Sequence, residues 1–467
     1  MRPDPLSTIL APIGGERQRR LPGATAAGAA PSTGSAWAIV LLLSALYCLS
    51  FIDRMILTLL VEPLKVDLGL SDTQLGLLHG LAFALFYATV GYPLGLLADR
   101  YSRKWIIAVG VLLWVTSTAV SAFSRSFAML FICRMGLGLG EAALSPAALS
   151  MIADLFRPDK RARAASIFIT GATIGGALAV IVGGWLAGIV SRGDAIDLRL
   201  LGPMHTWQLT LLAVSAPGFV LGLLMMLVPE PARGQTALPG QAIGFLAYVR
   251  RRRRLLALHI GGMTFCSICT FGFSMWIPTL LIRTLGWGPR DVALSYGPLL
   301  LVTSAVGMIG SGILADRGLR SGDPARAMRI AFWSMIGLAV STLWFTLVAS
   351  GPLSMLSSLA IFSIAAAAPF GVSLAALLAT TPNQFRGQIT AVYLFGVSFG
   401  GFAVGPALAG AFSDYLFPSQ DGLGHALALL AGVSLPFAAV MLRGAMRPYG
   451  KAVQDMNALA FDEALKS

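Results

Sequence analysis

Residues 91–104 read GYPLGLLADRYSRK, and residues 310–320 read GSGILADRGLR. Each copy closes the second long apolar run of its half of the chain. A second pair of segments repeats in the same way, because RARAASIFITGATIGGALA at 161–179 aligns with RGQITAVYLFGVSFGGFAV at 386–404. The two repeats indicate that the chain is an internal duplication.

Apolar stretches of membrane-crossing length recur along the whole chain. Of the 467 residues, 56% are hydrophobic and only 12% are charged, outside the usual balance of soluble proteins. A helix needs about 20 apolar residues to cross a bilayer, and lipid offers no hydrogen-bond partners to other backbone structures. We therefore expect an all-α membrane protein with twelve transmembrane helices in two pseudo-symmetric halves. The expected spans are 36–62, 74–97, 105–123, 127–150, 164–190, 207–228, 256–282, 293–315, 328–349, 353–379, 388–413 and 425–442.

The two halves are joined by a segment rich in Pro and Gly, which opens with PEPARGQTALPG. Such a composition is typical of a linker. We expect a flexible cytoplasmic leader at 1–35, six-helix bundles at 36–228 and 256–445, a cytoplasmic linker at 229–255 and a cytoplasmic tail at 446–467.

The net charge of +13 is distributed as in a membrane protein rather than a nucleic-acid-binding protein. Most of the 34 Lys and Arg fall in the loops that a cytoplasmic N-terminus would place inside the cell, as the positive-inside rule requires. Both termini are therefore expected in the cytoplasm. The basic run Arg250–Arg254 is interpreted as an anchor near anionic membrane lipids. A composition rich in Arg, with short loops, favours the bacterial cytoplasmic membrane.

The sequence contains no motif for catalysis or for a cofactor. Cys266 and Cys269 have CxxC spacing, but they lie in an apolar helix without His partners, so we expect no metal. HExxH, GxSxG and GxxxxGK[ST] patterns are all absent from the sequence. We expect no enzyme activity and no cofactor, and an ion gradient as the source of energy.

Four charged residues interrupt the apolar runs of spans one and four. Asp53 and Arg54 lie in LSFIDRMILTLL at 49–60, about 100° apart around the helix, so they need not pair with each other. Arg134 and Glu141 are seven residues apart and share one face, about 10 Å apart. An unpaired charge at the bilayer centre costs about 2.5–3.5 kcal/mol. We expect the four to face one another or a water-filled cavity; a static salt-bridge cluster is the alternative.

Two six-helix halves joined by a cytoplasmic loop resemble the major facilitator superfamily, and GLLADR followed by Arg103 and Lys104 looks like that family's signature between helices two and three. The resemblance implies a conformational gate that forms when the cytoplasmic side closes. Gly91 and Gly95 would permit close helix packing, and Asp99 would accept hydrogen bonds at the N-terminus of helix eleven. The other expected gate residues are Arg100, Arg103, Asp316 and Arg317. A solvated charged turn is the alternative for each copy.

FIDRM in helix one, together with CRMGLGLGEAALSPAALSMIADLF at 133–156, resembles the Spinster family. Members of that family are reported as exporters of sphingosine phosphate or lysophospholipids, and some are proton-coupled. The resemblance implies proton coupling at Asp53 and Glu141, and a substrate or charge-relay role for Arg54 and Arg134.

The middle parts of the spans in the second half contain no Asp, Glu, Lys or Arg, so one wall of the expected cavity is ionic and the other apolar. Such a cavity suits an amphipathic molecule with a charged head and an acyl tail. The candidates to line it are His79, Tyr87, Phe273, Trp276 and Tyr393. Packing in the helical core is the alternative for each aromatic residue, and a hydrogen-bonded packing role is the alternative for His79. We expect a monomeric secondary transporter, working by alternating access, whose partners are a small amphipathic lipid, protons and membrane lipids. A proton-coupled organic-anion or multidrug carrier, and a lipid receptor that moves no cargo, are the alternatives.

Overall fold

The computed structural model describes residues 33–190, 196–198, 202–231, 242–323, 325–382, 385–419 and 421–464. Within these ranges, twelve helical segments are long and apolar enough to cross a membrane. The predicted fold class is thereby confirmed. Nearly all of the expected leader, and residues 232–241 of the expected linker, lie outside the described part.

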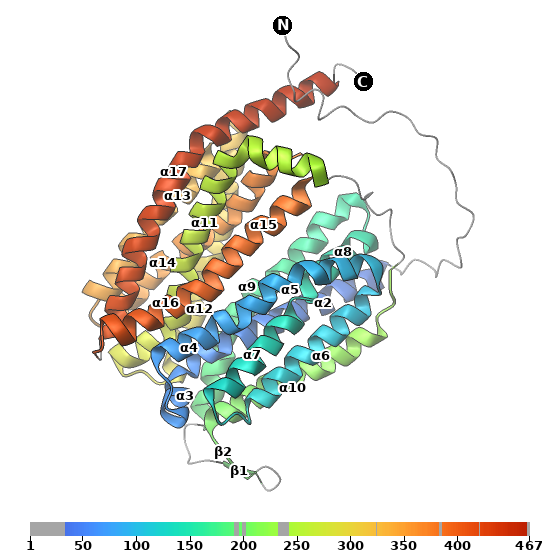
Figure 1. Ribbon diagram of the computed structural model, residues 1–467. Coiled ribbons are helices and arrows are strands. Elements are labelled where there is room, and N and C mark those ends of the chain that lie inside the picture. Colours follow the sequence, from blue (N-terminus) through green and yellow to red (C-terminus); the bar gives the residue numbers. More distant parts are fainter. Residues whose placement is uncertain are drawn as a thin grey trace.

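The first half runs from α2 to α10, and several of its spans consist of two helical pieces (Figure 1). Short helix α3 (Val61–Leu68) follows the first span, and strands β1 (Ile196–Leu198) and β2 (Gly202–Met204) pair antiparallel between the last two spans. The spans are α2 (Thr33–Met55) with η1 (Ile56–Leu59), α4 (Asp72–His79) with α5 (Leu81–Arg100), α6 (Arg103–Ser121), α7 (Phe127–Glu141) with α8 (Leu144–Leu155), α9 (Pro158–Val190) and α10 (Thr206–Leu227).

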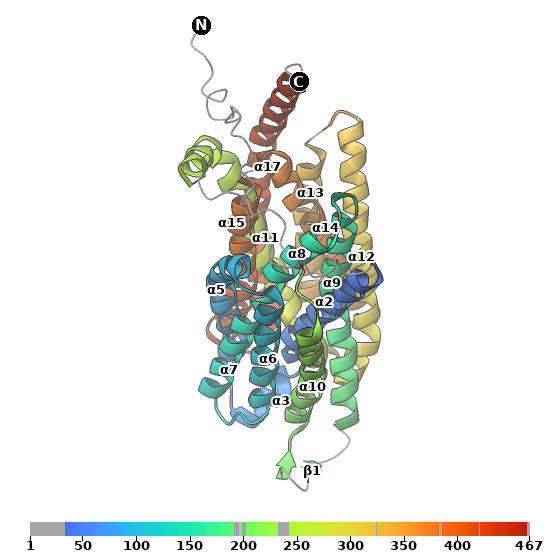
Figure 2. The same ribbon diagram turned by 90° about the vertical axis from the view of Figure 1, so that its right-hand side faces the viewer.

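The second half runs from α11 to α17, and Figure 2 shows it beside the first half from another side. Helix α11 begins at Ala242, so residues 242–255 of the expected linker are helical. No Gly or Pro interrupts the stretch from Phe245 to Arg254, and Leu, Ala and Arg are good helix formers. The elements are α11 (Ala242–Leu285), α12 (Pro289–Arg320), α13 (Arg326–Leu343) with η2 (Trp344–Val348), α14 (Pro352–Ala379), α15 (Arg386–Ser398) with η4 (Phe399–Val404), α16 (Gly405–Ala411) with η5 (Phe412–Leu416), and α17 (Gly422–Ala464).

The repeated glycines have equivalent packing roles in the two halves. A Cβ atom on Gly175 of α9 would collide with the backbone oxygen of Cys48 in α2. A Cβ atom on Gly400 of η4 would lie 2.6 Å from the Cγ2 atom of Thr264 in α11. Span five therefore packs on span one as span eleven packs on span seven, which is the relation that the duplication predicts.

The two halves contact each other closely at one end of the bundle, around α4 and α16 (Figure 1). Gly76 of α4 lies directly against the backbone of Pro406, and Gly184 of α9 lies against the backbone of Pro289. We call this the closed end; it contains α3, the start of α4, the end of α11 and η5. The opposite end contains the start of α9 and the end of α12.

Candidate functional site

Four spans depart from regular α-helix where the buried charges lie. Helix α2 changes into the 3₁₀ turn η1 one residue after Arg54. Helix α4 ends at His79, and α5 begins at Leu81 after Gly80, whose backbone is not helical (φ −103°, ψ −84°). Helix α7 ends at Glu141, and span eleven contains the π-helical turn η4. Such irregular turns are frequent at functional sites because they re-aim side chains.

The sequence GLGLGE explains why Glu141 comes close to the first span. Gly138 lies against the backbone of Phe83 in α5, and Gly140 lies against Gly110 in α6, so a side chain at either position would collide with a neighbouring helix. Pro146 has no N–H group to donate to the carbonyl of Ala142, which weakens the helix after Glu141. The close packing and the break together place the end of α7 where the Glu141 side chain reaches Arg54 of α2.

The four charged residues form one buried cluster. Arg54 Nη2 donates a hydrogen bond to Glu141 Oε2, and the two side chains form an ion pair. Arg134 Nη1 donates to the backbone oxygen of Asp53 at 3.2 Å. Neither carboxylate oxygen of Asp53 has a hydrogen-bond partner among the described residues. Asp53 and Arg54 are thus engaged separately, although they are adjacent in the sequence.

The four residues face one another in this conformation, which is one of the two expected arrangements, and they are shielded from solvent. None of the four residues is more than 4% exposed. The physical reason is a set of aromatic rings that surround the Arg54 guanidinium, with its Cζ atom over their faces. The distances from Arg54 Cζ to the ring centroids are 4.2 Å for Phe83, 4.6 Å for Phe51, 4.9 Å for Phe402 and 5.1 Å for Tyr87.

Three of the five residues that were expected to line the cavity lie at the contact between the halves. The Nδ1 atom of His79 is 2.8 Å from the backbone oxygen of Leu75. Its ring is 6.1 Å from that of Trp276, which comes from the second half. Tyr87 stacks on Phe83 at 5.1 Å, beside Arg54.

The other two expected cavity residues are packed inside the second half. The ring of Phe273 lies 4.6 Å from that of Phe362 and is 1% exposed. Tyr393 is 3% exposed, with its ring 6.2 Å from that of His259. In this conformation both residues have the core-packing role that was the alternative to lining a cavity, since large apolar rings readily fill a helical core.

The expected gate residues whose side chains the structure describes form no close contact between the halves in this conformation. A Cβ atom on Gly91 would have no neighbour within 4 Å, and one on Gly95 would lie 3.8 Å from Pro146 Cβ in the same half. Arg100, Asp316 and Arg317 are exposed. The side chain of Asp99 lies outside the described part of the structure. Their gating role stays a prediction.

Arg103 is the one deeply buried residue among the expected gate residues whose side chains are described. Its hydrogen bonds and ion pairs go to α8 and to the residues that follow α10. Its guanidinium forms ion pairs with Asp154 at the end of α8 and with Glu230, whose Oε1 atom is 2.9 Å from Arg103 Nε. Arg103 Nη2 also donates to the backbone oxygen of Pro231 at 2.9 Å. Arg103 therefore fastens the start of α6 to the ends of α8 and α10.

Glu230 makes this network sensitive to pH. Burial raises the pKa of Glu230, but hydrogen bonds from the Lys104 backbone N–H, the Ser102 hydroxyl and Arg103 outweigh burial, so the pKa lies below its ordinary value of 4.5. A carboxylate with a lowered pKa stabilises the folded state above its ordinary pKa. That contribution is lost as the pH falls through the lower folded-state value.

We expect Glu230→Gln to lower the melting temperature of the detergent-purified protein near neutral pH. The amide keeps the shape but loses the charge-assisted hydrogen bonds, a loss of about 1–2 kcal/mol for this partly exposed group. The difference from wild type should shrink below pH 4.5. Exposed Asp316→Asn serves as the control and should show no such difference. A Glu230→Gln deficit that stays constant down to about pH 3 would contradict this account.

The closed end contains a charged network between the halves that was not anticipated from the sequence. Asp72 of α4 is 2% exposed, and its carboxylate accepts a hydrogen bond from Lys65 Nζ at 2.6 Å. The same carboxylate accepts hydrogen bonds from two nitrogen atoms of Arg283, at the end of α11, each at 3.0 Å. Arg283 Nε in turn donates to Glu62 at 2.6 Å. One arginine of the second half is thus bound by two carboxylates of the first.

A second contact reinforces the same junction. The carboxylate of Asp414 in η5 accepts the backbone N–H groups of Asp72 at 3.2 Å and Thr73 at 2.6 Å. Asp414 thereby caps the N-terminus of α4 from the other half, where a negative charge is favoured. The sequence signal was weak, because charges just outside an apolar run are usually solvated loop residues.

Comparisons with known proteins agree with this architecture. A sequence profile of the Major Facilitator Superfamily, a family of transporters, matches residues 43–330. An MFS-type efflux pump of Mycolicibacterium smegmatis is 29% identical over 422 residues, which cover 88% of this chain and 91% of that protein. Protein spinster homolog 1 of Homo sapiens is 28% identical over 330 residues, which cover 66% of this chain and 60% of the human protein. The chain therefore matches less than two thirds of this human relative.

A solved structure has the same fold over nearly its whole length. It is the crystal structure of a bacterial homolog to the human lysosomal transporter Spinster, in an inward-facing and unoccupied conformation. The TM-score is 0.75 at 26% sequence identity, covering 92% of this chain and 99% of that chain. The chain therefore belongs to the major facilitator superfamily, as a Spinster-like secondary transporter that works by alternating access.

Proposed function

We propose that this transporter couples proton movement to the transport of an amphipathic, lipid-like substrate of the lysophospholipid or sphingosine-phosphate type. The observation that carries the proposal is the buried cluster. In it the carboxylate of Asp53 has no hydrogen-bond partner among the described residues, Arg134 bonds the backbone oxygen of Asp53, and Arg54 pairs with Glu141. Asp53 and Glu141 serve proton coupling, and Arg54 and Arg134 serve the substrate or the charge relay.

Asp53 is the residue proposed to carry the proton. An ionised carboxylate at this buried position would have at most the Trp114 indole N–H as a donor to replace its lost hydration, which is costly. We therefore infer that Asp53 is protonated in this conformation. The nearest charges acting on it are those of Glu141 and Arg134. If Arg134 turns from the backbone oxygen of Asp53 to its carboxylate, the ionised form becomes favoured and the proton leaves.

Arg134 is the proposed binder of an anionic head group. Its one hydrogen bond to a described residue goes to a backbone carbonyl, whereas Arg54 is held by Glu141 and by aromatic rings. A phosphate accepts two parallel hydrogen bonds from a guanidinium and competes well with a carbonyl. Arrival of the head group would thus move Arg134, and with it the balance that holds the proton on Asp53.

The lipid-like tail is proposed to lie against the second half. The middle parts of its spans contain no Asp, Glu, Lys or Arg, and aromatic rings such as Phe271 and Phe402 contact each other there at 4.1 Å. The Spinster resemblance supports the same substrate class.

The orientation follows from the distribution of basic residues. We propose that both termini are cytoplasmic and that the protein works as a monomer in a bacterial cytoplasmic membrane, with bundles at 36–228 and 256–445. The closed end then faces outward, and the conformation described here corresponds to an inward-facing state.

A proton-coupled organic-anion or multidrug carrier is a second candidate, favoured by the efflux-pump name of the mycobacterial relative. Arg134 would then bind the anionic group of the cargo. Native mass spectrometry of the purified protein separates the two candidates, because a co-purified lysolipid supports the first.

We expect Arg134→Ala to weaken binding of a phosphate-bearing lysolipid by about ten- to a hundredfold, since a charge-assisted hydrogen bond contributes about 1.5–3 kcal/mol. Binding of lysophosphatidylethanolamine and of uncharged monoacylglycerol is measured by native mass spectrometry. The monoacylglycerol affinity should change little, and exposed Arg125→Ala should leave both unchanged. Equal weakening of both lipids by Arg134→Ala would contradict the head-group role.

A further inference from the structure

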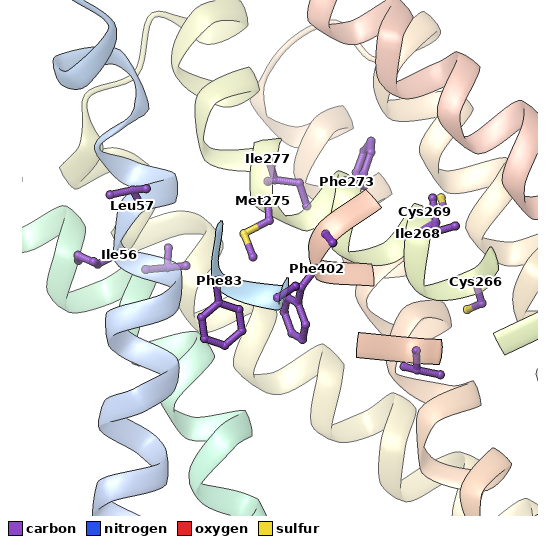
Figure 3. Packing of buried hydrophobic residues seen from close by; sticks show 14 of the residues in the cluster. Ile56, Leu57, Phe83, Cys266, Ile268, Cys269, Phe273, Met275, Ile277 and Phe402 are labelled. Atoms are coloured by element: carbon purple, nitrogen blue, oxygen red, sulfur yellow. The ribbon is translucent and has the colours of Figure 1, made fainter. Parts of the chain in front are cut away.

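Phe402 brings the second half into direct contact with the charged cluster of the first half. Its ring centroid lies 4.9 Å from Arg54 Cζ, whereas the other three rings around that guanidinium belong to the first half. Figure 3 shows Phe402 facing Phe83 across the junction, and the two ring centroids are 6.1 Å apart. Phe402 is 5% exposed, so its contact with Arg54 is shielded from solvent.

The backbone around Phe402 explains this position. Phe402 lies in the π-helical turn η4, which departs from the regular helix of α15. The backbone oxygens of Phe402 and Ala403 lie so close to Gly80 that a Cβ atom there would collide with them. On its other side the ring lies 4.1 Å from that of Phe271. The π-helical turn and the glycine thus hold one aromatic face against Arg54.

We propose that Phe402 is a positioning residue through which the Arg54–Glu141 ion pair controls the contact between the two halves. Glu141 holds the Arg54 guanidinium in place, and the face of the Phe402 ring attracts the cation. When Glu141 takes up a proton, or an anionic group draws Arg54 away, the guanidinium leaves the ring and the second half loses this attraction. The inference rests on the proposed function to the extent that the ion pair changes during the transport cycle.

Among the described residues, no charged side chain of the second half is found to interact with Arg54 or Glu141. The ionisable side chains that interact with Arg54 or Glu141 all belong to the first half; they are the neutral phenols of Tyr47 and Tyr87, and Arg134, with Asp53 beside Glu141. Phe402 therefore senses the ion pair through its ring and not through a charge of its own.

If Phe402 acted through packing alone, a different experimental result would be expected. Leu and Met fill space as Phe does, but they lack the ring quadrupole that attracts a cation. A packing residue would also contribute equally whether or not Glu141 is charged. The effect of a substitution at Phe402 in the presence and absence of the Glu141 charge therefore distinguishes the two roles.

The experiment is a double-mutant cycle on the full chain in lipid nanodiscs. Spin labels at Val66 and Tyr415, both strongly exposed at the closed end, report the ratio of the closed to the separated form. Phe402→Leu is expected to lower this ratio about tenfold in the wild-type background and less than about twofold in the Glu141→Gln background. Phe402→Met, which tolerates irregular packing, should repeat the result, and Phe402→Tyr should stay within about twofold of wild type.

Phe362→Leu is the matched control, because Phe362 is a buried aromatic residue of the second half that packs on Phe273. Its effect should be the same in both backgrounds. Equal effects of Phe402→Leu and of Phe402→Met in the two backgrounds would overturn the inference.

The outcome of the Phe402 double-mutant cycle can be distinguished from the outcome of the test of proton coupling. Proton coupling is measured independently, as the response of transport of fluorescent lysophosphatidylethanolamine to an imposed pH gradient. If Glu141→Gln loses that response while the Phe402 cycle shows no coupling, the present inference fails and the proposed function stands. If the cycle shows coupling while Asp53→Asn and Glu141→Gln keep the response, the proposed function fails and the link through Phe402 stands.

Discussion

Asp53→Asn is expected to bind substrate with nearly wild-type affinity and to lose the response of transport to an imposed pH gradient. The amide has the shape of a protonated carboxyl group but cannot release a proton. Asp53 is 0% exposed, and its carboxylate oxygens have no partner among the described residues, so the substitution breaks no ion pair there. The effect should fall on coupling rather than on folding. Glu141→Gln should be uncoupled as well, with a weaker hold on Arg54.

The measurement compares two modes of transport in proteoliposomes. Accumulation of lysophosphatidylethanolamine under a pH gradient should be lost in Asp53→Asn, whereas exchange of labelled for unlabelled substrate without a gradient should persist. Asp291→Asn replaces an exposed carboxylate at the start of α12 and should leave both modes unchanged. Normal gradient-driven accumulation by Asp53→Asn would show that this residue is only a structural neighbour of Arg134.

Arg283→Ala is expected to shift the protein strongly toward the form that is separated at the closed end. Arg283 binds both carboxylate oxygens of Asp72 and one of Glu62, and these contacts join the two halves. Its removal leaves Asp72, which is nearly buried, with Lys65 as its one remaining basic partner in this network. Loss of one member of a buried ion pair costs about 3–5 kcal/mol, which corresponds to a population change of more than about a hundredfold.

The shift is measured by spin-label distances at both ends of the bundle. The pair Val66–Tyr415 should separate, and the pair Lys160–Arg320 at the opposite end should approach, because alternating access opens one end as it closes the other. Arg252→Ala is the matched control, since Arg252 also belongs to α11 but pairs with Asp455 of its own half at 2.8 Å. If Arg252→Ala gives the same distances as Arg283→Ala, the network at the closed end has no special role in the conformational balance.

The twelve spans could be predicted from the sequence because membrane insertion requires each helix to be apolar by itself. The shared face of Arg134 and Glu141 was also predictable, since it depends on helical spacing alone. The pairing of Arg54 with Glu141, by contrast, depends on the interruptions of α2 and α7 and on the packing of the span-four glycines against α5 and α6. Local spacing contains no information about such contacts.

The charged network at the closed end escaped prediction for a different reason. Asp72 and Arg283 lie at the ends of apolar runs, where charged residues are usually solvated and where their partners are distant in sequence. Phe273 and Tyr393 were assigned to a cavity because of their chemical type, but burial inside one bundle is decided by which helix face points inward. In both cases tertiary packing decides what a local sequence pattern leaves open.

The π-helical turn η4 also bears on how the two copies of the duplicated unit diverged. A π-helical turn closes its hydrogen bonds over five residues instead of four, so it accommodates one additional residue. An alignment of the two copies without gaps holds through the repeated glycines, which end at Gly401. Beyond η4, which ends at Val404, the extra residue of the π-helical turn puts the two helices out of phase, and one residue of helix corresponds to a rotation of about 100°. A single codon gained or lost at this turn is therefore enough to redirect every later side chain of the span, and ancestral symmetry at the junction could be broken in one step.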